Sequence, residues 1–435
     1  MSEGKIVAGI DVGTSKIVSI IAKIDEGASN AKTVNVLGVS EVPSVGIKKG
    51  QIVDIKEAVE CINNSLDGAE RMAGYSVSHA IASIGGSHIE SQNSRGVVAV
   101  ATRLGEISQN DLDRVIDAAR AVSLPSSRQI IHVLARNYTV DGQEGIKDPI
   151  GMTGIRLEVD THIISCGVTS LSNLEKAFSQ VGIDIDAVVF NGYASSLAVL
   201  SDTEKELGVV LVDIGAGTCD ISIYIEGAVA YSSVLPVGAR HITNDLAIGL
   251  RISLESSEKI KLFLSGSTKK QKLAEFEEHK ARENRNIDEI DLSPLSLPEE
   301  IRKVSQKTLI EGIIRPRLNE IFTMIGLEIK RSGFGGQTPS GLVVTGGGAQ
   351  TIGIVNAAKR VLAMPVRVGY PTNIKGIIDE IQDTPFATVV GLCVYGGTIE
   401  TPSSLPFGIS LPKLPGLFLN KIFSKIIGIA KSFLP

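Results

Sequence analysis

Two copies of one short pattern constrain what this chain can fold into. Each copy is an apolar run rich in β-branched residues, which predicts a buried strand, followed by an aspartate, a glycine turn and a second apolar run. The copies span residues 6–21 and 208–224. One copy alone could be an ordinary hairpin, but its recurrence with the same residue types indicates two related halves of one fold.

The residues of these turns also indicate a chemistry. Glycine lets backbone N–H groups approach an oxyanion, because no Cβ stands in the way. A carboxylate beside a phosphate repels it unless a cation lies between them, so Asp213 favours Mg²⁺, reached through water. The two hairpins would then face each other across one phosphate chain. The phosphate-loop pattern GxxxxGK[ST] does not occur in the sequence, so a nucleotide would be held in this other way.

A third glycine turn and a charged pair are candidates for the rest of such a site. A glycine triplet at 346–348 follows a predicted strand at 341–345. Three glycines would let a flat ring lie against bare backbone, whereas a plain strand-to-helix turn needs one. Glu258 and Lys261 stand three residues apart on a predicted helix at 253–263. Such a pair is usually solvated, but in this position it could instead grip a ribose and a purine.

Composition argues against several classes of function. A net charge of −5, without a basic stretch interleaved with aromatic residues, argues against nucleic-acid binding. The four cysteines are far apart and form no CxxC pair, so we expect reduced thiols rather than a zinc site or disulfides. His132 and His162 are isolated, which is more typical of structural histidines than of ligands. The first predicted strand begins almost at the N-terminus, so we expect no signal peptide.

The order of predicted strands and helices indicates an α/β protein with an inserted small α+β domain. The long helix expected at 305–330 contains Pro316, which should bend it. The expected division is 1–84 for the first core, 85–162 for the inserted domain, 163–200 for the first core continued, 201–250 for the second core, 251–322 for a peripheral subdomain, 323–364 for the second core continued and 365–399 for a return to the first core.

The end of the sequence predicts a membrane contact. A proline-rich linker at 400–416 precedes a segment at 417–435 that separates apolar residues from lysines at about 100° per residue. A helix of about 27 Å is marginal for spanning a bilayer, and its central lysines would be costly in lipid. We expect it to lie in the membrane interface rather than to dock on the protein's own core. The expected membrane-binding residues are Phe418, Leu419, Lys421, Ile422, Phe423, Lys425, Ile426, Ile427, Ile429, Lys431, Phe433 and Leu434.

These features resemble a known family. The paired Asp-Gly hairpins, the glycine triplet and the small-residue linking helices are similar to those of the superfamily of actin, sugar kinases and heat-shock-chaperone ATPases. Within it, the segments at 9–17, 148–164, 236–250 and 343–350, together with the amphipathic end, resemble the FtsA family of bacterial cell-division proteins nearly end to end. The resemblance implies an actin-like two-lobed ATPase fold with duplicated ribonuclease-H-like cores and a C-terminal amphipathic helix.

The resemblance also implies an ATP and Mg²⁺ site, with Asp11 and Asp213 near the metal. The linking helix at 191–200 lacks the proline or acidic residue that the family pattern leads us to expect, so its nucleotide contact stays open. No residue stands out as an activated base, so we expect at most weak ATPase activity. The residues expected to contact nucleotide are Asp11, Gly13, Thr14, Ser15, Lys16, Asp213, Gly215, Ala216, Gly217, Thr218, Glu258, Lys261, Gly346, Gly347 and Gly348.

Partners follow from the same resemblance. The family polymerises through its actin-like body and inserted domain, and tethers the tubulin-like FtsZ to the cytoplasmic face of the inner membrane at the division septum. It also meets other proteins of the divisome. The C-terminal peptide of FtsZ is expected on 251–322, where Arg315 and Arg317 are candidates to meet that acidic tail.

Two other functions remain open from the sequence. A small-molecule kinase of the same fold would need an aspartate base at a substrate cleft, and the inserted domain supplies no obvious one. A pilus-assembly adaptor would share the ATP-binding core but would not need a terminal lipid-binding helix.

Overall fold

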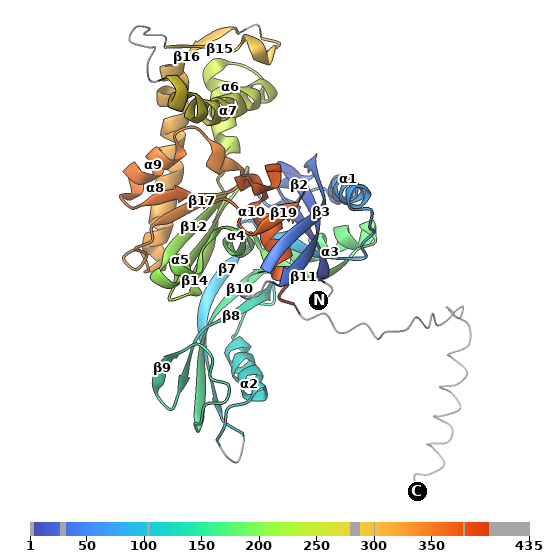
Figure 1. Ribbon diagram of the computed structural model, residues 1–435, viewed down its shortest axis with the longest axis vertical. Helices are drawn as coiled ribbons and strands as arrows, with labels where there is room; N and C mark the ends of the chain where they lie inside the picture. Colours follow the sequence, from blue (N-terminus) through green and yellow to red (C-terminus); the bar gives the residue numbers. More distant parts are fainter. Residues whose placement is uncertain are drawn as a thin grey trace, which may run out of the picture. The chain divides into compact units, whose positions relative to one another are not determined.

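The computed structural model of the 435-residue chain describes residues 4–26, 32–101, 105–278, 288–299, 301–376 and 379–399 (Figure 1). The chain divides into a compact unit, Met1–Thr398, and a second unit, Ile399–Pro435. The predicted linker and amphipathic helix, with every expected membrane-binding residue, lie outside the described residues.

The first core is a six-stranded sheet with the order β11-β6-β1-β2-β3-β19. Its strands are β1 (Lys5–Val12), β2 (Lys16–Glu26), β3 (Lys32–Pro43), β6 (His79–Ile84), β11 (Asp184–Phe190) and β19 (Ile374–Gly376). The first three strands are antiparallel, and β6 and β11 then add parallel to β1. The late strand β19 pairs with β3, so the chain returns to the first sheet near its end, within the predicted range 365–399.

The second core repeats this arrangement with the order β14-β13-β12-β17-β18. Its strands are β12 (Val209–Ile214), β13 (Cys219–Ile225), β14 (Ala228–Leu235), β17 (Leu342–Thr345) and β18 (Val366–Val368). Again three antiparallel strands come first, and two strands then add parallel to the first of them. Without the extra β19, both sheets have the strand order 3-2-1-4-5. The two related cores predicted from the hairpins are confirmed.

Helices cover each sheet. Alternate residues of a strand point to opposite faces of its sheet and so contact different helices. In β1, Ala8 and Ile10 belong to the hydrophobic cluster formed with α1 (Ile55–Ala73) and α3 (Val168–Val181). Gly9 lies between them and faces the other side, where a Cβ would come within 3.1 Å of a side chain in α10 (Ala387–Gly396). On the second core, α8 (Arg315–Ser332) and α9 (Ile354–Leu362) pack into a separate cluster with the strands.

Two small-residue helices connect the cores. They are α4 (Asn191–Val199), which contacts the second sheet, and α10, which contacts the first. They cross so closely that a Cβ added to Gly391 would lie 1.8 Å from the carbonyl oxygen of Ala194. Larger side chains at this crossing would separate the cores, which explains the small residues seen in the sequence.

The inserted domain has its own sheet, with the order β7-β10-β8-β9, and one helix. Its elements are β7 (Glu90–Ala99), α2 (Gln109–Arg120), β8 (Arg128–Val140), β9 (Gln143–Ile146) and β10 (Arg156–Gly167). Ser108, the N-cap of α2, forms a capping box with Asp111. The boundary expected after 162 falls inside a strand, because β10 is continuous and pairs with β7 and β8 along its length. No proline or glycine interrupts 156–166, so nothing in the sequence ends the strand there.

The predicted helix at 305–330 begins with a π-helical turn, η2 (Thr308–Ile314), and continues as α8. The Arg315 N–H donates to the Ile310 carbonyl, five residues back, directly before Pro316. This irregular turn stands where the bend was predicted. Above α8 in Figure 1 lie α6 (Arg240–Leu250) and α7 (Leu254–Glu278), the latter extending well past the predicted 263. Strong helix formers at 269–278 explain the extension.

The remaining elements are short. They are β4 (Ile47–Lys48), β5 (Gln51–Ile52), α5 (Asp202–Leu207), β15 (Glu289–Asp291), η1 (Ser293–Leu295), β16 (Lys303–Ser305), η3 (Gly347–Gln350), η4 (Asp379–Gln382) and η5 (Thr384–Phe386).

Candidate functional site

The two hairpin turns have the same geometry. The Gly13 N–H donates to the Lys16 carbonyl at 3.1 Å, and the Gly215 N–H donates to the Thr218 carbonyl at 2.9 Å. The turns also meet, since a Cβ added to Gly217 would lie 2.9 Å from Thr14 Oγ1. Turns from separate cores are therefore brought face to face, as the sequence predicted.

An aspartate lies at the strand end before each turn. Asp11 is half-buried and accepts a hydrogen bond from Ser83 Oγ at 2.7 Å. Burial raises the pKa of Asp11 to about 6; the Ser83 hydrogen bond opposes this shift, and the nearby Asp213 adds to it. Asp213 is buried and accepts hydrogen bonds from Ser195 in α4 and, at 2.9 Å, from Thr388 in α10. Burial also raises the pKa of Asp213.

The linking helix α4 contacts Asp213 directly. α4 lacks the expected proline or acidic residue but reaches the site through the Ser195 hydroxyl. Both linking helices thus hydrogen-bond to one carboxylate, Asp213.

A third carboxylate, Asp220, was missed in the sequence. It lies directly across the hairpin from Asp213 and is buried. Thr218 Oγ1 donates to one of its oxygens at 3.1 Å, and its other oxygen has no hydrogen-bond partner among the described residues. Burial, together with Asp213, raises its pKa well above the usual range. An acidic residue inside the apolar run at 219–225 is the signal that would have found it.

A cavity of about 920 Å³ opens beside the turns and is lined from both cores. That volume suits a ligand of nucleotide size. The predicted residues on its wall are Thr14, Ser15, Lys16, Ala216, Glu258, Lys261, Gly347 and Gly348. The other predicted residues, which do not line it, are Asp11, Gly13, Asp213, Gly215, Gly217, Thr218 and Gly346. These lie in the same turns and strand ends, so every part of the predicted site comes together.

Glu258 and Lys261 form part of the cavity wall rather than a solvated surface pair. Lys261 Nζ donates to Glu258 Oε2 at 2.7 Å and to Thr243 Oγ1 at 2.9 Å. The Thr243 hydroxyl in turn donates to Glu258 Oε2 at 2.6 Å. The Lys261 side chain is 10% exposed, so this network is fixed and shielded on one side.

The three glycines of the triplet have different roles. Gly346 has a φ of 81°, and a Cβ there would lie 2.1 Å from Asp213 Oδ1. A Cβ on Gly348 would lie 2.4 Å from the Ile214 side chain. Packing against β12 therefore requires these two glycines. A Cβ on Gly347 would meet nothing within 4 Å, so Gly347 presents bare backbone to the cavity.

Further residues on the wall were not predicted. Lys16 Nζ bonds Glu41 at 2.5 Å and lies 4.5 Å from the centre of the Phe386 ring. Arg240, at the start of α6, is exposed to the cavity and forms no ion pair among the described residues. No sequence pattern marks Phe386 or Arg240 as site residues. They reach the cavity only because the tertiary fold brings η5 and α6 to it.

The arginines predicted to meet a partner lie outside this cavity. Arg317 donates to both oxygens of Asp245 in α6, at 2.6 and 2.9 Å, and also pairs with Glu320. Arg315 pairs with Glu311. Both guanidinium groups therefore already have acidic partners within the chain.

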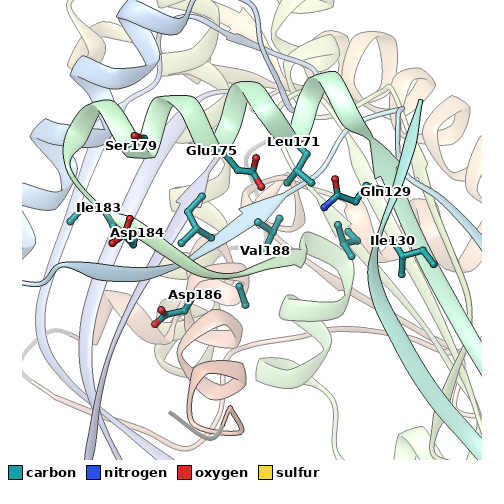
Figure 2. Close-up of a pocket in the computed structure, with 12 residues that line it drawn as sticks. Gln129, Ile130, Leu171, Glu175, Ser179, Ile183, Asp184, Asp186 and Val188 are labelled. Atoms are coloured by element: carbon teal, nitrogen blue, oxygen red, sulfur yellow. The ribbon is translucent and has the colours of Figure 1, made fainter. Parts of the chain in front are cut away.

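A second cavity, of about 390 Å³, lies where the first core meets the inserted domain. Figure 2 shows α3 running along β11, with Leu171 and Glu175 directed toward the strand. Asp186 on β11 also pairs with His79 Nδ1 at 2.9 Å. The predicted site residues do not line this cavity.

The two isolated histidines are structural, as predicted. His132 Nε2 accepts the Phe190 N–H at 3.1 Å. His162 lies between Asn93 and Ser232, at 2.7 and 3.0 Å, and so joins the inserted domain to β14. Burial lowers the pKa of both imidazoles, to about 4 and about 3.

His, Cys, Asp and Glu side chains in the part of the chain that the structure describes form no group of three or more that could hold a metal ion. None of the helices there has both the length and the apolar character needed to cross a bilayer.

Comparison with solved structures shows the fold. The PilM–PilN type IV pilus biogenesis complex matches with a TM-score of 0.61 at 13% identity, covering 90% of this chain and 99% of that one. MreB5 of Spiroplasma citri bound to ADP matches with a TM-score of 0.50 at 12% identity, covering 90% and 96%. The actin-like ATPase fold expected from the hairpins is confirmed.

Comparison of sequences is more specific. The family described as "Cell division protein FtsA" matches residues 210–391, and that described as "SHS2 domain inserted in FTSA" matches 86–165. The cell division protein FtsA of Pseudomonas aeruginosa is 36% identical, covering 96% of this chain and 97% of that protein. Those of Borreliella burgdorferi and Escherichia coli are 37% and 32% identical, covering 97% and 91% of each chain. The chain therefore belongs to the FtsA family of cell division proteins.

Proposed function

We propose that the chain binds ATP with Mg²⁺ in the cavity between its two cores. The observation that carries this proposal is the meeting of the two glycine turns, one from each core, beside a cavity of about 920 Å³. The turns offer backbone N–H groups to phosphates, the Glu258–Lys261 pair lies on the wall to meet the ribose and purine, and Gly347 offers bare backbone beneath them. MreB5, which shares the fold, is described as bound to ADP.

The donor set fits Mg²⁺ rather than a metal enclosed by protein. Asp213 lies close enough to Asp11 to oppose ionisation of the Asp11 carboxyl, and a cation between the two would relieve this repulsion. Mg²⁺ typically keeps several waters and is held by one or two carboxylates together with substrate phosphates. This agrees with the lack of a group of three ligands among the described residues. Bound there, Mg²⁺ would neutralise phosphate charge, while the chain's own turns orient the phosphates.

Calorimetry of the Asp213→Ala variant tests this proposal. We expect Mg²⁺-ATP affinity to fall more than about tenfold, because the change removes a charge near the metal and the acceptor shared by α4 and α10. Ser222→Ala is a matched control, since Ser222 is also buried in the second hairpin but its hydroxyl has no partner among the described residues. Unchanged affinity in Asp213→Ala would discard the site.

We further propose that the protein tethers FtsZ filaments to the cytoplasmic face of the inner membrane at the division septum, and that it polymerises there. Membership of the FtsA family supports this role, and so does the amphipathic pattern at 417–435. Vesicles of anionic and neutral lipids test the membrane contact. Ile426→Glu should release the protein from anionic vesicles without changing ATP affinity, because it puts a charge on the apolar face. A variant that still sediments with the vesicles would refute the membrane role of this segment.

The FtsZ peptide is proposed to bind the subdomain at 251–322. An acidic peptide could reach Arg317 only by exchanging with Asp245, and Arg315 only by exchanging with Glu311. Binding would therefore replace internal ion pairs. Other division proteins are proposed to meet the inserted domain, at whose junction with the first core the second cavity lies.

The two alternatives have less support. Likeness to the PilM–PilN complex is 13% in sequence and shows the fold alone, whereas the FtsA relatives reach 32–37% over most of the chain. A small-molecule kinase would transfer phosphate rapidly from ATP to a sugar or acetate. Robust phosphotransfer in such an assay would favour the kinase over a scaffold with at most weak ATPase activity.

A further inference from the structure

The hairpin of β4 and β5 carries a strained lysine at its tip. Its two central residues, Lys49 and Gly50, both have positive φ, 49° and 74°, and the flanking strands pair directly on either side. This is the pattern of a type I′ turn, which favours Asn, Asp or Gly at its first central position. A left-handed backbone is costly for a side chain such as lysine. Strain of this kind persists where the surroundings fix it, and it clusters at functional sites.

The surroundings of this turn are the two glycine hairpins. The Gly50 N–H donates to Thr14 Oγ1 at 3.0 Å, in the turn of the first core. The Cα of Lys49 lies 3.2 Å from the position that a Cβ on Gly217 would take, in the turn of the second core. The Lys49 carbonyl oxygen lies 2.9 Å from the corresponding position on Gly86, just after β6. The strained residue is thus held at the meeting point of the two cores.

Among the described residues, the ammonium group of Lys49 has no acidic partner, whereas the two lysines on the cavity wall each have one. Lys16 is bonded to Glu41, and Lys261 is bonded to Glu258. Lys49 is exposed, and its side chain forms no ion pair or hydrogen bond among the described residues. Three carboxylates, the half-buried Asp11 and the buried Asp213 and Asp220, lie in the strands behind the adjoining turns. A terminal phosphate approaching them needs compensating positive charge.

We propose that Lys49 binds the terminal phosphate of the nucleotide and makes the site prefer a triphosphate to a diphosphate. The inference rests on the nucleotide-binding function proposed above. With the purine end at Glu258 and Lys261 on the cavity wall, the phosphate chain would run over the two turns and end toward the point where they meet. A lysine ammonium is a compact charge with three donors, well suited to a phosphate. The turn would retain lysine, despite the strain, because asparagine or glycine cannot supply that charge.

The Lys49→Asn variant tests this inference without endangering the fold, because asparagine is favoured at this turn position. Lys48→Asn is the matched control, since Lys48 is an exposed neighbour in the same hairpin. Calorimetry with Mg²⁺ measures the affinity for ADP and for a non-hydrolysable β,γ-imido analogue of ATP, and thermal melting measures stability. For Lys49→Asn we expect analogue affinity to fall about tenfold or more, ADP affinity to fall less than about threefold, and the melting temperature not to fall. Lys48→Asn should match the wild type.

Each other outcome has a definite meaning. Wild-type analogue affinity in Lys49→Asn would overturn the role of Lys49 while leaving the nucleotide site intact. Equal losses for ADP and the analogue, or equal losses in both variants, would overturn recognition of the terminal phosphate by this position. A wild-type protein that binds neither nucleotide would overturn the proposed function, and the role of Lys49 with it.

Discussion

Replacing Asp11 by asparagine should stabilise the nucleotide-free protein while removing its response to Mg²⁺-ATP. Burial raises the pKa of Asp11 from 3.8 to about 6, so the folded protein holds this proton more tightly than the unfolded chain does. The stability that comes from the protonated carboxyl is fully present below pH 3.8 and is lost as the pH rises through about 6. At neutral pH the ionised carboxylate therefore destabilises the fold.

The size of the effect follows from the same shift. About two pKa units correspond to about 3 kcal/mol, and solvent screening of this half-buried side chain reduces the figure to about 1–2 kcal/mol. Asparagine keeps an oxygen that can accept the hydrogen bond from Ser83 Oγ, so the change mainly removes the charge. A gain of this size should raise the melting temperature of a chain of this length by about 1–3 °C.

Thermal melts of the wild type and the Asp11→Asn variant, across about pH 4 to 8, measure this difference. The variant should be more stable at neutral pH, and the gap should close on acidification. Mg²⁺-ATP should raise the melting temperature of the wild type by ligand linkage but not that of the variant. A variant less stable than the wild type at neutral pH, or a gap that does not change with pH, would refute the reasoning.

Three further predictions concern other parts of the structure. Arg317→Ala should lower the free energy of unfolding, measured in denaturant melts, by about 1–3 kcal/mol, because it removes two charge-assisted hydrogen bonds to Asp245. Adding Asp245→Ala to this variant should lower it little further, and additive losses would contradict the pairing. Gly217→Ala should weaken ATP binding about tenfold in calorimetry, because its Cβ would lie 2.9 Å from Thr14 Oγ1 in the facing turn. Gly312→Ala is the control, because its Cβ would meet nothing within 4 Å; equal ATP affinities of the two variants would argue against close contact of the turns. The His162 imidazole, with a pKa lowered to about 3 by burial, should show no NMR titration from about pH 5 to 8, and a titration near its ordinary pKa would place it in solvent.

The parts of the fold that sequence could predict are those where one local pattern fixes one local structure. Each Asp-Gly hairpin contains its own turn hydrogen bond, so its geometry follows from the residues within it. The duplication of the hairpins indicated two related halves, and the structure shows that their two sheets share one strand order. The capping box at Ser108 is local in the same sense, since its two partners stand three residues apart.

Features that depend on distant residues could not be predicted in the same way. β10 continues through 162 because it pairs with β7 on one side and β8 on the other. Nothing in the sequence of β10 itself predicts this pairing. Arg240 reaches the cavity because α6 begins next to the second turn, which only the tertiary fold shows. Asp220 combines both cases. The sequence shows that it lies in an apolar strand, but only the structure shows that one of its carboxylate oxygens has no hydrogen-bond partner among the described residues.

A crystal structure of the protein with bound ATP and Mg²⁺ tests the central claim most directly. The account predicts one nucleotide per chain, with its phosphates between the turns that contain Thr14 and Gly217 and with Mg²⁺ on the side of Asp11 and Asp213. A nucleotide bound elsewhere, or one whose phosphates contact a single core, would contradict it.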